Sequence, residues 1–154
     1  AATAFDLLER AKPVAGIEIR FASRQLDLPI DNPGWIALLN GGVLQRERFG
    51  GALRTEVAWF AIGDVEFVTH PGETSPAYSL ASRRLMRSGN GFVLGLALDA
   101  VGYILKPEYF VAGAAFPSAE YLTATSLGPQ TGPLLLDALE SIVPSRTRQP
   151  DPAN

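Results

Sequence analysis

The stretch TEVAWFAIGDVEFVT, residues 55–69, decides the fold of this chain. Residues 55–62 and 65–69 are rich in β-branched and aromatic side chains, which are typical of β-strands. Gly63 and Asp64 stand between them and form a dipeptide typical of tight turns. The sequence therefore predicts an antiparallel hairpin here.

The segment upstream of the hairpin predicts two helices and a strand. Residues 3–11 predict a short surface helix, and residues 35–39 predict another, followed by a mobile loop as far as Gly51. Apolar residues alternate over residues 17–30 but change phase near the middle, so we expect a strand with a bulge.

The segment downstream of the hairpin predicts two more strands and two more helices. Residues 78–86 predict a helix, residues 92–98 an apolar strand central in the sheet, and residues 121–127 a last strand. Gly128-Pro129 opens a final helix. Together these elements indicate an α/β fold with an α+β tendency, built on a mixed or antiparallel sheet packed with helices.

Composition narrows the classes of protein. The 154 residues are 47% hydrophobic and 19% charged, as in a globular domain. The net charge of −3 is too mild to favour binding to nucleic acid. Cysteine is absent, which excludes disulfides and cysteine-ligated zinc without fixing a compartment. The apolar run at residues 95–105 contains Asp99 and is too short to span a membrane.

The two ends of the sequence give weaker indications. The first residues resemble neither a signal peptide nor an initiator region, so we expect a proteolytic fragment or one chain of a cleaved protein. Residues 144–154 are polar and rich in proline, so we expect a flexible tail.

Two polar residues follow predicted strands and could carry chemistry. Glu73 emerges from the turn HPGE, where a carboxylate can bind a metal, act as a base or cap a helix; residue type alone favours the cap or turn. Tyr103 follows Gly102, and residue type alone favours ordinary aromatic packing for Tyr103. For Asp99, which precedes Gly102 and Tyr103, residue type alone favours a role in a turn.

His70 is the sole histidine, and we expect a surface or hydrogen-bonded side chain there rather than a metal ligand. Because it precedes Pro71, its backbone is held extended and its side chain can point away from Glu73. No nucleophile elbow, phosphate loop, dinucleotide fingerprint or paired-histidine zinc helix is found, so a complete hydrolytic site is absent.

Short motifs between Gly16 and Leu139, most of them after Val68, resemble those of the neutral/alkaline (non-lysosomal) ceramidase family in order and approximate spacing. They are Pro71-Gly72-Glu73, Arg83-Arg84-Leu85, Gly95-Leu96-Ala97, Gly102-Tyr103-Ile104, Glu108-Tyr109, Glu120-Tyr121 and the run at residues 126–131.

This resemblance implies a zinc-dependent amidohydrolase that cleaves the N-acyl bond of ceramide or a related lipid amide. It assigns Glu73 and Tyr103 as zinc ligands and Tyr121 as the catalytic residue that lines the substrate amide. Residues 1–143 then form the C-terminal portion of a ceramidase-like catalytic domain. The family's histidine ligands lie in the preceding portion, so an N-terminal chain or segment of the same protein would supply them, and a secreted or periplasmic location is favoured.

Departures from the family pattern leave other functions open. Asp99 and Gly102 stand where typical members carry other polar residues, and His70 replaces an apolar one. A noncatalytic relative, acting as a lipid-binding or structural domain, is therefore the alternative. A self-sufficient interaction module, in which the motifs are only turns, is the third possibility.

Overall fold

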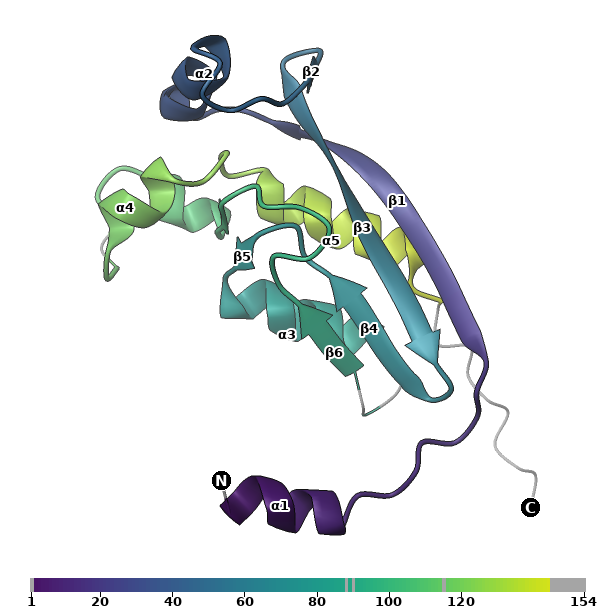
Figure 1. The fold of residues 1–154 in the computed structure, drawn as a ribbon. Coiled ribbons are helices and arrows are strands. Elements are labelled where there is room, and N and C mark those ends of the chain that lie inside the picture. The colour runs from purple at the N-terminus through teal and green to yellow at the C-terminus, as the bar shows by residue number, and fades with distance from the viewer. Residues whose placement is uncertain (1, 88, 90, 115, 145–154) are drawn as a thin grey trace, which may run out of the picture.

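The computed structural model describes residues 2–87, 89, 91–114 and 116–144 (Figure 1). Its helices are α1 Ala2–Glu9, α2 Pro33–Asn40, α3 Pro76–Leu85, the 3-10 helix η1 Pro107–Phe110, α4 Ala119–Ala124 and α5 Thr131–Ile142. Its strands are β1 Ile19–Pro29, β2 Arg48–Phe49, β3 Ala52–Ile62, β4 Val65–Thr69, β5 Glu73–Thr74, β6 Gly91–Leu94 and β7 Tyr103–Ile104.

The main sheet has the strand order β1-β3-β4-β6, with β2 paired to the start of β3. Strands β1, β3 and β4 are antiparallel neighbours, whereas β4 and β6 run parallel. The expected α/β fold with a mixed sheet is confirmed. The hairpin is confirmed as β3 and β4, which turn at residues 63–64.

Helices α3 and α5 cover one face of this sheet and pack against each other (Figure 1). Between the sheet and these two helices lies a core of fully buried side chains, which includes Leu28, Val57, Val68 and Leu139. Each such side chain stabilises the fold by about 2 kcal/mol through the apolar surface it removes from water. This core fixes the strand ends from which the candidate site is built.

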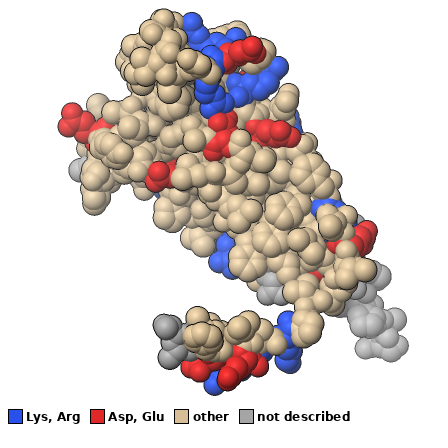
Figure 2. Space-filling model, viewed as in Figure 1, with Lys and Arg blue, Asp and Glu red and all other residues tan. Residues whose placement is uncertain are grey.

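The opposite face of the sheet carries a line of aromatic rings, called here the phenylalanine row: Phe21, Phe60, Phe67 and Phe92. These residues are successive partners in the strand registers, and the ring centroids of Phe60 and Phe67 lie 4.7 Å apart. Phe21 is 66% exposed and Phe92 is 53% exposed. Figure 2 shows few charged side chains over the middle of the sheet in this view. The sheet therefore presents an apolar surface on the side away from α3 and α5.

The bulge expected in the strand at residues 17–30 is not found in strand β1. All of its residues from Ile19 to Pro29 pair with β3 in one unbroken register. The apolar pattern changes phase because Ile19 and Phe21 lie on the exposed face, whereas Leu26 and Leu28 face the core. The sheet is apolar on both faces, and a bulge is not needed to explain the pattern.

The expectation of a central strand at residues 92–98 is wrong in position and length. Strand β6 ends at Leu94 and lies at an edge of the described sheet, paired only with β4. Leu96 and Leu98 have φ angles of 52° and 70°, which leave the β region and end the strand. Composition alone does not reveal such angles.

The strand expected at residues 121–127 is also wrong, because this segment contains helix α4. Thr123 and Thr125 are β-branched, a type that favours strands on average, but their hydroxyls donate to the carbonyls of Ala119 and Tyr121 at 2.7 and 2.8 Å. These bonds to the preceding turn satisfy the hydroxyls within a helix. The four expected helices are confirmed as α1, α2, α3 and α5.

Two terminal features complete the description. Helix α1 lies apart from the body (Figure 1), and its Phe5, Leu7 and Leu8 are exposed. Among the described residues, no helix combines the length and apolar character needed to cross a membrane. Residues 145–154 of the expected tail lie outside the described residues.

Candidate functional site

The backbone of the candidate site is made by three chain segments that run side by side. Strands β5 and β7 form a separate two-stranded parallel sheet in which Glu73 is the partner of Tyr103. The Glu73 amide donates to the Gly102 carbonyl at 3.0 Å. The Tyr103 amide in turn donates to the carbonyl of Thr125, just after α4, at 3.3 Å. The site is therefore tied through its backbone to the residue that follows α4.

Two glycines allow these segments to lie so close together. A Cβ atom at Gly72 would lie 2.3 Å from the Gly102 carbonyl oxygen. At Gly102 a Cβ atom would lie 2.0 Å from the Thr125 carbonyl oxygen, and its φ of +81° also favours glycine. Glycine is therefore required for steric reasons at the positions just before Glu73 and Tyr103.

The structure brings together the three residues that the resemblance assigns to the site. Glu73 is exposed and Tyr103 is half-buried. The rings of Tyr103 and Tyr121 meet edge to face with centroids 5.9 Å apart, and Tyr121 is 60% exposed. One carboxylate and two phenols from β5, β7 and α4 therefore form a small oxygen-rich cluster.

This cluster changes the acidity of Tyr103. Partial burial, followed by the hydrogen-bonding and negatively charged Glu73 and by Tyr121, raises the pKa of the Tyr103 phenol above its ordinary value. The phenol therefore stays protonated at neutral pH unless a cation compensates the added negative charge. Such a cation would find two oxygen donors side by side.

His70 lies outside this cluster, as the sequence indicated. Its side chain is completely buried, with Nδ1 2.8 Å from Thr74 Oγ1 and Nε2 2.9 Å from Ser82 Oγ. Burial lowers the pKa of His70 to about 4, so the imidazole is neutral at pH 7. Because both ring nitrogens already have partners, His70 is a hydrogen-bonded core residue.

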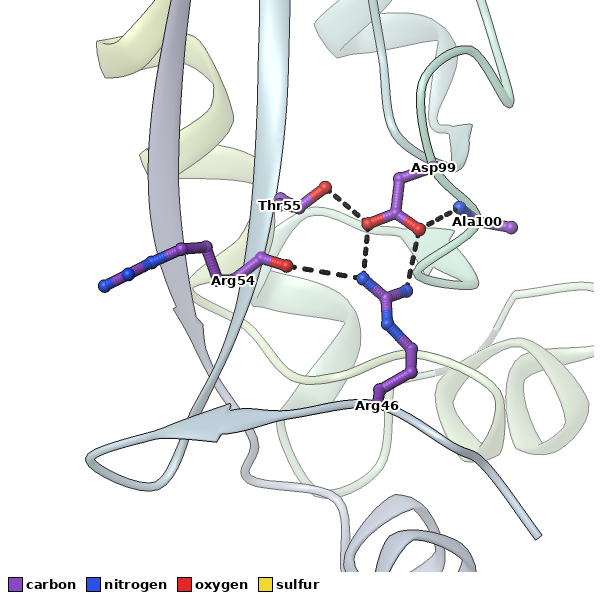
Figure 3. A network of polar contacts seen from close by, with 5 residues as sticks. All are labelled: Arg46, Arg54, Thr55, Asp99 and Ala100. Carbon is purple, nitrogen blue, oxygen red and sulfur yellow. Dashed lines mark hydrogen bonds and ion pairs between the residues drawn. The ribbon is translucent and has the colours of Figure 1, made fainter.

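Asp99 does more than form a turn. Its carboxylate accepts two hydrogen bonds from Arg46, at 2.7 and 2.6 Å, and one each from Thr55 Oγ1 and the Ala100 amide (Figure 3). Burial would raise the pKa of Asp99, but the bonds from Arg46, Thr55 and Ala100 outweigh it and lower the pKa. Arg46 belongs to the segment expected to be a mobile loop, which also contains β2.

Glu73 lies on the rim of two open pockets. One, of about 350 Å³, has mostly apolar and aromatic walls that include Tyr103, Leu105, Tyr109, Phe116 and Leu122. The other, of about 390 Å³, is lined by Trp35, Leu38, Leu44, Leu96 and others. The single carboxylate thus stands between two apolar spaces.

The fold has a counterpart among solved structures. A neutral ceramidase from Pseudomonas aeruginosa matches with a TM-score of 0.54 and 17% sequence identity. The fold is ceramidase-like. The match covers 91% of this chain but 31% of that chain, so the chain spans about a third of the ceramidase. No family model and no curated protein sequence matches it.

The ceramidase-like fold raises the question of whether these residues suit zinc. Carboxylate and phenolate oxygens are both acceptable to zinc, and Glu73 and Tyr103 offer one of each at neighbouring positions. Within the described ranges, no three histidine, cysteine or acidic side chains cluster closely enough to hold a metal. Two neighbouring oxygens can supply only part of a zinc ligand set, so a zinc ion at this position would need further ligands.

Sequence reasoning assigned no role to two groups of residues around this candidate site. Tyr109 and Phe116 stack with ring centroids 4.3 Å apart and line the pocket beside Tyr103. Their signal was present, since aromatic residues interrupt a segment rich in proline and turns. Arg46 gave no such signal, because its partner Asp99 lies 53 residues away.

Proposed function

We propose that this chain supplies part of the active site of a zinc-dependent amidohydrolase that cleaves the N-acyl bond of ceramide or a related lipid amide. The observation that carries the proposal is the Glu73–Tyr103 register pair with Tyr121 against it. The ceramidase-like fold supports the same reading.

The roles follow from chemistry and position. Glu73 and Tyr103 would hold zinc through their oxygens, and Tyr121, whose ring contacts Tyr103, would orient the substrate amide through its hydroxyl. When bound, zinc supplies Lewis-acid polarisation of the amide carbonyl and of water. The two apolar pockets beside Glu73 would accept the hydrocarbon portions of the substrate and keep water from them.

The remaining ligands define the partner. We expect histidines from an N-terminal chain or segment of the same protein, because the resemblance places them there. Glu73 and Tyr121 are exposed in this chain, so another polypeptide can reach them. The chain alone would therefore be inactive.

The test is native mass spectrometry of the protein purified under non-denaturing conditions, with zinc measured in the same sample. We expect the chain together with its N-terminal partner and about one zinc ion per complex. Glu73→Ala should lose the zinc, whereas Glu120→Ala, which removes an exposed carboxylate from α4, should keep it. Retention of zinc by Glu73→Ala would contradict the ligand assignment.

A noncatalytic lipid-binding or structural domain is the second candidate. It is favoured by the two apolar pockets, which need no metal to bind a hydrocarbon chain. A lone, monodisperse and zinc-free chain that still binds a lipid amide would support this candidate.

A further inference from the structure

The loop at residues 95–102 has an unfavourable backbone that needs support. Leu96 and Leu98 both have positive φ angles, and their side chains are 55% and 63% exposed. Leucine rarely adopts such angles, and burial of these two side chains does not compensate for them. Other contacts must hold the loop in this shape.

Asp99, between these strained residues and Tyr103, supplies such contacts. Its two oxygens accept four hydrogen bonds, and the partners come from three places: the segment before β2, strand β3 and the loop itself. Arg46 also donates to the carbonyl of Arg54 at 3.3 Å, so the guanidinium bridges the loop to β3 (Figure 3). The side chains of Arg46 and Asp99 are 27% and 17% exposed. A bidentate pair this sheltered fixes direction as well as distance.

The contacts of Asp99 lead directly to the candidate site. Val101, two residues on, donates its amide to the Pro71 carbonyl at 2.7 Å. The next carbonyl, that of Gly102, accepts the Glu73 amide at 3.0 Å. A shift of the loop would therefore move Tyr103 out of register with Glu73.

We propose that Asp99 is a positioning residue. Held by hydrogen bonds from Arg46 and Thr55, it sets the register of Glu73 against Tyr103. The function of that pair as zinc ligands rests on the proposed function above, but its positioning by Asp99 does not. The proposal can therefore be tested without metal or substrate.

The experiment is NMR of the 154-residue chain, comparing Asp99→Asn with the parent. We expect the amides of Glu73 and Val101 to exchange with solvent at least about tenfold faster in the variant, while amides of β3 and β4 change little. The nuclear Overhauser effect between the Tyr103 and Tyr121 rings should weaken. A role in overall stability alone would instead speed exchange in all strands together.

Two further variants sharpen the result. Arg46→Lys keeps the charge but not the paired hydrogen bonds, so it should fall between the parent and Asp99→Asn. Asp27→Asn is the matched control, because it removes a different bidentate pair, in which Arg54 of β3 donates to Asp27 of β1 at 2.7 and 2.9 Å. It should leave the exchange rates of the Glu73 and Val101 amides unchanged. If Asp99→Asn does not fold, the comparison of Arg46→Lys with Asp27→Asn decides.

The proposal is overturned if amide exchange in Asp99→Asn is unchanged, or is faster by the same factor in all strands. If Asp99→Asn does not fold, the same criterion applies to Arg46→Lys. Failure of the proposed function looks different, because there Glu73→Ala keeps its zinc while the local effect of Asp99→Asn remains. The two ideas therefore stand or fall on separate measurements.

Discussion

Glu73 and Tyr103 are direct partners in the β5–β7 ladder, although 30 residues separate them in the sequence. Their side chains therefore leave the same face of a short parallel sheet, and Tyr121 meets them from α4. Because the backbone holds the pair, changes to the side-chain oxygens can be made with little effect on the fold.

Tyr103→Phe and Tyr121→Phe should separate metal binding from turnover in the assembled protein. Each keeps the aromatic ring and removes one hydroxyl. If Tyr103 is a zinc ligand as proposed, Tyr103→Phe should weaken zinc binding by at least about tenfold. Tyr121→Phe should keep zinc and lower kcat by about a hundredfold, as for loss of one hydrogen bond to the reacting carbonyl. Zinc titration and ceramide hydrolysis check this; equal zinc loss in both variants would contradict the division of roles.

Gly102→Ala should destabilise the chain because its Cβ would collide with the Thr125 carbonyl as well as force a positive φ. We expect a loss of about 2–4 kcal/mol in the free energy of unfolding, measured in urea. Gly42→Ala is the matched control, with a φ of +69° and nothing within 4 Å of the added methyl group. A similar loss in both variants would show that the close approach to Thr125 has no role.

The stability of the fold should fall in mild acid because of His70. Its folded pKa of about 4 lies below the ordinary 6.5, so the unfolded chain binds a proton more readily. The contribution of neutral His70 is complete above pH 6.5 and is lost as the pH falls toward 4, by about 3 kcal/mol in total. Urea unfolding at pH 7.5 and pH 4.5 measures the loss.

His70→Gln provides the control for this pH dependence. Glutamine cannot titrate in this range. The free energy of unfolding should therefore differ less between pH 7.5 and pH 4.5 in the variant than in the parent. An imidazole NMR signal that titrates near pH 6.5 in the folded chain would contradict the assignment of a buried neutral His70.

The phenylalanine row should make the isolated chain associate. Phe21 and Phe92 are the more exposed ends of the row, and apolar patches of this kind favour association in water. Replacement of both by serine should reduce the concentration dependence of the apparent mass in sedimentation. Leu7→Ser in the separate helix α1 tests whether any exposed apolar side chain has the same effect.

Much of the fold could be predicted because strand periodicity and turn chemistry are local. The hairpin around Gly63 and the final helix are confirmed for that reason. Helix α4 was missed because Thr123 and Thr125 favour strands on average, whereas their hydroxyls bond to the preceding helical turn here. The end of β6 was missed because the positive φ of Leu96 depends on tertiary contacts.

The candidate site was less predictable than the fold. Residue types alone favoured a cap for Glu73 and simple packing for Tyr103, and the resemblance directed attention to both. Their proximity is now a structural fact, whereas their roles as zinc ligands stay predictions. The bond between Arg46 and Asp99 joins positions whose sequence context gives no sign of a pair.

The parallel pairing of Glu73 with Tyr103 also determines where the chain can change in length. Residues inserted between α3 and β6 would enlarge a connection and leave both partners in place. A single residue inserted between Asp99 and Tyr103 would disturb the bonds that join Val101 and Gly102 to Pro71 and Glu73, and with them the pairing of Tyr103 with Glu73. Natural or engineered length variation should therefore be tolerated before β6 and abolish the site after Asp99.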